Sequence, residues 1–92
     1  MDPEVLAGRL AEVAESLGFE VRTCPADSEG AVVVLRGKWI VFVPEGALPA
    51  RKVEIVARAL AAVDTEGLFL LPAVREAIER ARGSGGRNGE RA

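Results

Sequence analysis

The stretch that most constrains the fold is 31–43, AVVVLRGKWIVFV, in which two runs of strand-forming residues are interrupted once by Gly37-Lys38. This pattern predicts a β-hairpin with a two-residue loop, because glycine at the first loop position suits a type II′ turn. Counting outward from the loop pairs Arg36 with Trp39. The remaining predicted pairs are Leu35 with Ile40, Val34 with Val41 and Val33 with Phe42. Both faces of the hairpin are apolar, so we expect both faces to be covered.

Three amphipathic helices are predicted around the hairpin. The first begins at Pro3 with Asp2 as its N-cap, and Gly18 supplies a left-handed C-terminal cap. The second covers 49–63 and the third covers 72–82. Apolar residues recur at helical spacing on one side of each helix, so each should cover part of a core.

A further strand is predicted at 19–24, where apolar and charged residues alternate. Turn-forming residues at 25–30 separate this strand from the hairpin. The sequence therefore predicts an α+β fold of order α-β-β-β-α-α, in which a small antiparallel three-stranded sheet, a meander, packs with three helices. The short apolar run at 68–71 is a candidate for one more strand.

The length of the chain, 92 residues, suits one hydrophobic core, so we expect a single α+β domain over 1–82. Residues 83–92 contain no apolar residue larger than alanine. Burial of such side chains cannot offset the conformational entropy that ordering would cost. We therefore expect a flexible C-terminal tail over 83–92.

The chain has no histidine, no tyrosine and a single cysteine, Cys24. A Ser-His or Cys-His pair needs an imidazole and a zinc site needs several His or Cys ligands, so one chain can assemble neither. We predict no cofactor. The enzyme alternative that remains is a carboxylate or metal site with Asp64, Glu66 and Glu45 around a cleft, or a site completed by another subunit.

A second alternative is a nucleic-acid-binding protein, for which the last two helices would present their basic residues on one side. These residues are Arg51, Lys52, Arg58, Arg75, Arg80 and Arg82. The formal net charge of the chain is −2, whereas nucleic-acid-binding domains are normally clearly basic. We therefore rank nucleic acid below protein as a partner.

Trp39 lies beside the predicted turn and opposite Arg36, and both residue types are enriched at interfaces. Val41 and Val43 share the hairpin face of Trp39, so these four residues form the candidate interface. The structural alternative for Trp39 and Arg36 is a cation–π pair. Covering both hairpin faces requires helices on both sides of the sheet or a second copy of the chain, and we favour a homodimer.

The chain opens with Met-Asp-Pro-Glu and contains no run of about 18 apolar residues, so neither a signal peptide nor a membrane span is predicted. A lone cysteine agrees with a reducing compartment. We expect a cytoplasmic protein, and the richness in Ala, Val, Gly, Arg and Glu is typical of a bacterial chain.

Residues 37–43, a short loop and residues 56–62 resemble the core of ImmA/IrrE-type metallopeptidase domains, which place a zinc-binding His-Glu-Leu-Gly-His helix there. Aligned in this way, the two histidine positions fall on Arg58 and Ala62, and the glutamate position falls on Ala59. The resemblance therefore implies a relative that lacks the zinc site and is not catalytic.

The absence of catalytic side chains and the well-marked α+β pattern together favour a non-catalytic protein-interaction or regulatory module. Such a module would bind its partner through the sheet or through the surface of the third helix. The nucleic-acid-binding protein and the carboxylate or metal-dependent enzyme are the two alternatives.

Overall fold

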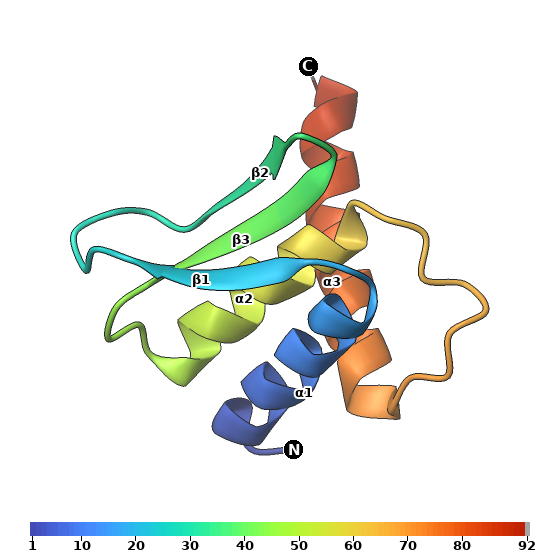
Figure 1. Ribbon diagram of the computed structural model, residues 1–92. Helices are drawn as coiled ribbons and strands as arrows, with labels where there is room; N and C mark the ends of the chain where they lie inside the picture. Colours follow the sequence, from blue (N-terminus) through green and yellow to red (C-terminus); the bar gives the residue numbers. More distant parts are fainter. Residues whose placement is uncertain (92) are drawn as a thin grey trace.

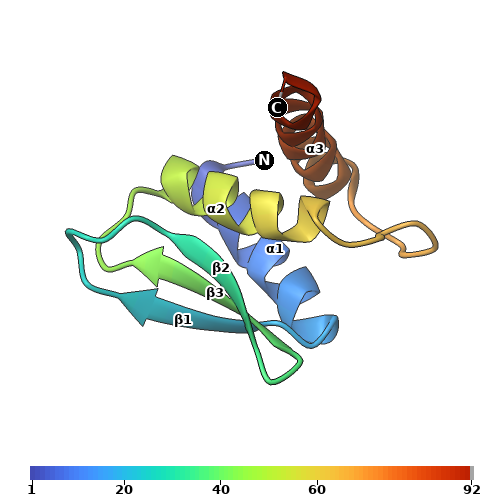
Figure 2. The ribbon, with the colours of Figure 1, turned by 90° about the horizontal axis from the view of Figure 1, so that it is seen from above.

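All three helices lie on one side of a three-stranded sheet, in two successive layers (Figures 1 and 2). This computed structural model describes the backbone of residues 1–91 and the side chains of residues 1–83. The elements are α1 (Pro3–Ser16), β1 (Glu20–Cys24), β2 (Ala31–Leu35), β3 (Lys38–Pro44), α2 (Pro49–Ala61) and α3 (Pro72–Arg91). α1 and α2 pack against each other and against the sheet, and α3 packs on α2. The predicted α+β order α-β-β-β-α-α is confirmed.

The helices begin at the predicted prolines, which are Pro3, Pro49 and Pro72. Proline suits a first helical position because its missing N–H leaves no hydrogen bond unmade there. Asp2 caps α1, since its Oδ1 accepts a hydrogen bond of 3.3 Å from the backbone N–H of Glu4. The backbone of α3 continues to Arg91, beyond the predicted end at 82 and through most of the expected flexible tail at 83–92. The side chains of 84–92 lie outside the described set, and the flexibility of the tail stays a prediction.

The sheet is mixed, and the predicted antiparallel meander is wrong in its strand order. β3 lies in the centre, parallel to β1 and antiparallel to β2. The physical reason is burial, because Trp39 to Val43 form an unbroken apolar run in β3, and a central strand is flanked along both edges. β1 carries Glu20 and Arg22, which suit an edge.

The hairpin forms, but its turn lies one residue earlier than predicted. Arg36 and Gly37 make the loop with φ angles of 53° and 79°, as a type I′ turn requires. The observed pairs are Leu35 with Lys38, Val34 with Trp39, Val33 with Ile40, Val32 with Val41 and Ala31 with Phe42. Each partner is shifted by two positions from the prediction, and since side chains alternate with a period of two, the residues on each face are those predicted.

The core lies between the sheet and the helices. Its largest fully buried side chains are Leu10, Val41, Leu60, Val74 and Ile78, drawn from α1, β3, α2 and α3. The ring of Trp39 packs on that of Phe19, with 5.5 Å between centroids and 45° between the planes. Leu10, Val41 and Leu60 come from three elements far apart in the sequence, so this core holds the whole domain together.

The opposite face of the sheet has no helix over it in the described part of the chain, so the alternative of helices on both sides is wrong (Figure 2). This outer face carries Val33 and Leu35 of β2 beside Ile40 and Phe42 of β3. Ile40, flanked by strands on both sides, is only 4% exposed. Most of the apolar surface that remains exposed on the outer face therefore belongs to β2.

Residues 62–71 between α2 and α3 form a loop, and the expected short strand at its end is not formed. Two arginines of α3 hold this loop. Arg82 Nη2 donates a hydrogen bond of 3.4 Å to Oγ1 of Thr65, which is buried, and Arg75 Nη2 donates one of 3.4 Å to the carbonyl of Leu68. The loop is thus fastened to the helix that follows it.

Candidate interaction surfaces

β2 is an exposed apolar edge strand. Its sequence, AVVVL, contains no charged residue, and Val34 and Leu35 are 55% and 59% exposed. β2 pairs with β3 on one side only, and among the described residues no strand lies on its other side. Edge strands of soluble proteins normally carry a charge or a proline that prevents pairing. β2 has neither, so its free backbone groups are available to another strand.

A groove of about 400 Å³ runs beside β2 on the helix side of the sheet. Val32 and Trp39 line it from the sheet, Ile55 and Ala59 line it from α2, and the exposed Arg58 also borders it. The groove exists because α2 packs mainly over β3 and leaves β2 partly uncovered. The free edge and the groove adjoin each other along one strand, and together we call them the β2 surface.

The four residues predicted to form an interface do not share one surface. Val41 is 0% exposed beneath the helices, whereas Arg36 is exposed in the turn. Trp39 is half-buried in the groove beside β2, opposite Val34, and Val43 lines a different groove. Of the four, Trp39 and Arg36 therefore lie at the β2 surface, and their part in an interface stays a prediction.

Val33, Val34 and Leu35 were not among the predicted interface residues. In the predicted meander β2 would be the central strand, where apolar side chains need no further explanation. The sequence does contain a pattern that indicates their exposure. Residues 31–35 are five strand-forming residues without a charge, and they are followed by a second uncharged apolar run at 39–43. Since only one of two neighbouring strands can be central, the other had to be an exposed apolar edge.

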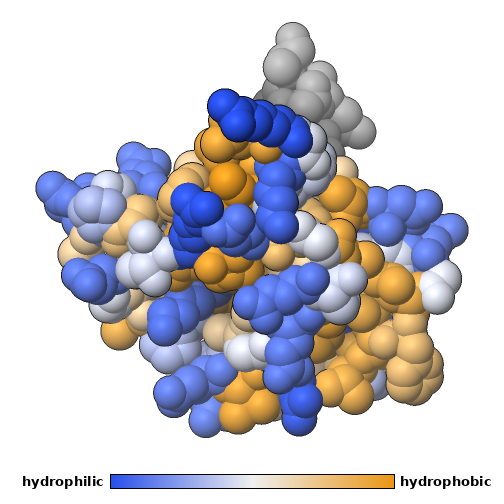
Figure 3. Space-filling model, in the orientation of Figure 1, coloured by the Kyte–Doolittle hydropathy of each residue, from blue (hydrophilic) through white to orange (hydrophobic). Residues whose placement is uncertain are grey.

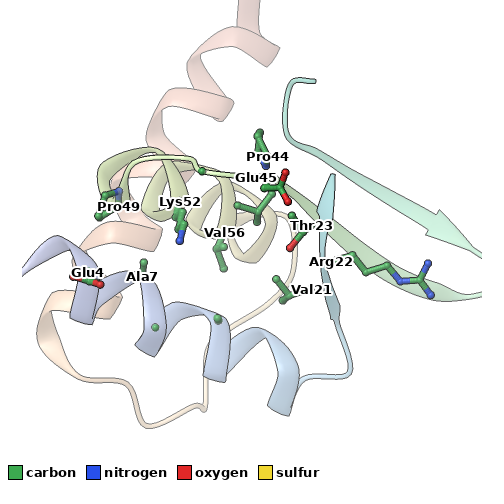
Figure 4. A pocket seen from close by; sticks show the side chains of 14 residues that line it. Glu4, Ala7, Val21, Arg22, Thr23, Pro44, Glu45, Pro49, Lys52 and Val56 are labelled. Carbon is green, nitrogen blue, oxygen red and sulfur yellow. The ribbon is translucent and has the colours of Figure 1, made fainter. Parts of the chain in front are cut away.

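A second groove, of about 540 Å³, lies where the parallel strands β1 and β3 end, between α1 and the start of α2 (Figure 4). Its apolar lining includes Ala7, Val21 and Val56. Figure 4 shows Lys52 pointing toward α1, on which Glu4 lies, whereas Arg22 points away from the groove. Because acids and a lysine both border it, the groove shows no preference for a ligand of one charge.

The loop 62–71 presents a single aromatic side chain to the solvent. Phe69 is 98% exposed, between the half-buried Leu68 and the buried Leu70. Apolar side chains gather over this loop and the start of α3 in the space-filling view (Figure 3). The exposure of Phe69 was not predicted, because residues 68–71 have the apolar pattern of a short strand. An exposed phenylalanine on a fastened loop is a second apolar feature of the surface.

In the part of the chain whose side chains are described, the basic residues of α2 and α3 do not form a continuous ridge. Three of the six contact acidic side chains: Arg51 with Glu54 at 3.9 Å, Arg80 with Glu76 at 3.8 Å and Arg82 with Glu79 at 2.7 Å. Arg75 donates to the loop carbonyl of Leu68. Lys52 and Arg58 border separate grooves. The positive charge of these six residues is therefore dispersed, and half of it is paired with carboxylates.

The three carboxylates of the enzyme alternative lie at opposite ends of α2. Glu45 precedes this 13-residue helix and Asp64 follows it, so about 20 Å of helix separates them. Asp64 Oδ1 accepts a 2.9 Å hydrogen bond from the N–H of Glu66, as in an Asx turn. Among the described residues, no three potential metal ligands of the His, Cys, Asp or Glu type come together.

Glu20 and Arg22 form an ion pair on the outer face of β1. The hydrogen bond from the Arg22 guanidinium holds the pKa of the Glu20 carboxyl below its ordinary value, and the positive charges of Arg22 and Lys38 act in the same direction. Both side chains remain partly exposed to water. The pair thus keeps the β1 edge of the sheet charged, in contrast to the β2 edge.

Within the described part of the chain, no helix combines the length and the apolar character that crossing a bilayer would need. No protein-family model, no curated protein and no solved structure matches this chain.

Proposed function

We propose that this chain is a non-catalytic protein-interaction module, which binds a protein partner through its sheet and acts in the bacterial cytoplasm as a homodimer. The observation that carries the proposal is the uncovered sheet, whose β2 exposes Val33, Val34 and Leu35 while both other strands are flanked or charged. Exposed apolar surface that is continuous with an unpaired strand edge is typical of an interaction site.

The alternatives find less support in the geometry. A carboxylate enzyme would need Asp64, Glu66 and Glu45 around one cleft, but α2 separates Glu45 from the other two. A nucleic-acid-binding protein would need a basic ridge, but Arg51, Arg80 and Arg82 have carboxylate partners. An interaction module needs neither arrangement.

The resemblance to ImmA/IrrE-type domains agrees with a non-catalytic role and remains part of the proposal. The aligned positions Arg58, Ala59 and Ala62 lie on or directly after α2. Ala59 is buried in the core, whereas Arg58 and Ala62 border the groove beside β2. At the place where that family holds zinc, this chain has an apolar groove.

The test compares the proteins that bind the full chain with those that bind a variant whose sheet surface is charged. Val33→Glu with Leu35→Glu should abolish binding, because the new carboxylates would have to be desolvated in the interface. Val5→Glu is the matched control, since Val5 is an exposed valine on α1, away from β2. Binding is measured by crosslinking and mass spectrometry in the source cell, and circular dichroism establishes that both variants fold.

Two outcomes would contradict the proposal. Binding partners, including further copies of the chain, that are retained by the double variant would place the interaction elsewhere on the surface. A complete lack of bound protein for the unmodified chain would remove the interaction role itself.

A further inference from the structure

The free edge of β2 carries unpaired backbone groups that another strand can bind. Ala31–Leu35 pairs with β3 along one edge, so alternate N–H and C=O groups on the other edge have no strand beside them in the described part of the chain. We propose that β2 pairs antiparallel with β2 of a second copy, so that two three-stranded sheets join into one sheet of six strands. This inference rests on the proposed function and names the geometry of its homodimer.

The symmetry of the strand favours a second copy over an unrelated peptide. A two-fold axis perpendicular to the sheet keeps each side chain on its own face, so a residue must face a residue of the same parity. A register centred on Val33 meets this condition and pairs all five residues of β2, with Ala31 opposite Leu35 of the second copy. Every facing pair is then apolar, and no charged residue of β2 has to be buried.

The charges that flank β2 are complementary under the same symmetry. Glu29 precedes the strand and Arg36 follows it, and both are exposed. Antiparallel pairing centred on Val33 brings Glu29 of one copy within one position of Arg36 of the other, at both ends of the paired strands. Opposite charges at these ends favour the antiparallel arrangement, whereas parallel pairing would place like charges together.

The groove beside β2 provides room on the helix side of the joined sheet. In the register centred on Val33, Val32 and Val34 of the second copy lie on the face that borders the groove lined by Trp39 and Ile55. Valine side chains suit this apolar lining. The pairing would therefore bury Val34, which is 55% exposed in the single chain.

The β1 edge is protected from pairing with another strand in this way. Glu20 and Arg22 lie along it, and the strand ends at Cys24-Pro25. Charged side chains and proline prevent edge-to-edge pairing. Because only one of the two edges is unprotected, association should stop at a dimer and should not continue into a filament.

The first experiment tests the register with a cysteine at the symmetry centre. In a Cys24→Ser chain, Val33→Cys places two thiols opposite each other, with Cα atoms about 4.5–5.5 Å apart, a separation that a disulfide can span. Air oxidation should give a covalent dimer on a non-reducing gel. Thr23→Cys in the same background is the control, because Thr23 is exposed on β1 at the other edge, and this variant should run only as monomer on the non-reducing gel.

The second experiment measures mass by light scattering at micromolar concentration. The full chain should show twice its monomer mass of 9.7 kDa. Val34→Lys should halve the measured mass, because the lysine would have to be buried against the second copy. Thr23→Lys, at an exposed position on β1, should leave the mass at twice the monomer. Circular dichroism establishes that both variants fold.

The proposed pairing of two β2 strands is wrong if the full chain stays monomeric in light scattering. It is also wrong if the dimer persists in Val34→Lys, or if Val33→Cys gives no covalent dimer. These results are distinguishable from failure of the proposed function. A monomeric chain that still binds other proteins, and loses them with the double variant Val33→Glu and Leu35→Glu, would keep the interaction role and replace the second copy with another partner.

Discussion

At the scale of single residues, substitution of glycine by alanine should have opposite effects on the free energy of unfolding at Gly30 and at Gly8. A Cβ on Gly30 would lie 2.6 Å from Ile55 Cδ1 and 3.0 Å from the carbonyl oxygen of Phe42, whereas a Cβ on Gly8 would meet nothing within 4 Å. Gly30→Ala should lower the free energy of unfolding by about 1–3 kcal/mol through overpacking. Gly8→Ala should raise it by up to about 1 kcal/mol, because alanine is the better helix former.

Urea unfolding of both variants measures these changes in the free energy of unfolding. Equal stabilisation by the two substitutions would contradict the close contact between Gly30, which directly precedes β2, and Ile55 of α2. Gly8 also illustrates a limit of the sequence, since glycine within a helix can mark either a close contact or nothing. Here the surrounding space is open.

Glu20 gives a pH-dependent prediction. Because the pKa of its carboxyl is lowered in the folded chain, the pair with Arg22 stabilises the fold above the ordinary carboxyl pKa, and this contribution is lost as the pH falls through the lowered value. Arg22→Gln should return the pKa of Glu20 toward its ordinary value. Side-chain carboxyl shifts in an NMR titration report it, and an unchanged pKa in the variant would exclude Arg22 as the cause.

At the scale of elements, the hairpin turn gives a test of register. Arg36 has φ = 53°, a conformation that asparagine adopts more readily than arginine. Arg36→Asn should raise the free energy of unfolding by about 0.5–1 kcal/mol, because Asn-Gly is favoured in type I′ turns. Lys38→Asn is the control, since Lys38 lies in β3 and asparagine is poor in strands. The reverse order of stabilities would support the Gly37-Lys38 turn instead.

The elements themselves could be predicted from the sequence, but their arrangement could not. Pro3, Pro49 and Pro72 mark the helix starts because their effect is local. Either Arg36-Gly37 or Gly37-Lys38 satisfies a two-residue loop, and the choice depends on tertiary packing. Because the two registers differ by two positions, the faces of the hairpin were nevertheless predicted.

The exposed edge of β2 could not be predicted from its local sequence, because it depends on the order of the strands in the sheet. Chain order suggested a meander with β2 in the centre, whereas β3 takes that place between β1 and β2. The exposed edge at Val33, Val34 and Leu35 follows only from the observed order. The local sequence contained these residues, but their exposure is a property of the whole sheet.

At the scale of the whole molecule, strand separation predicts which contacts form first. β2 and β3 are joined by two residues, but β1 pairs with β3 across a much longer segment, as in Glu20 with Ile40. Closing the longer loop costs more entropy. Val32→Ala should therefore slow folding, whereas Val21→Ala should mainly accelerate unfolding. Stopped-flow fluorescence of Trp39, the only tryptophan, measures both rates. Equal slowing of folding by the two substitutions would contradict this order.

The central position of β3 also matters while the ribosome synthesises the chain. β1 and β2 emerge before β3, yet neither pairs with the other in the finished sheet. At about 5–20 residues per second, the nascent chain spends a short interval with both strands complete and their common partner still unmade. During that interval AVVVL is an uncharged, aggregation-prone segment without its partner strand, and the synthesis of β3 supplies that partner.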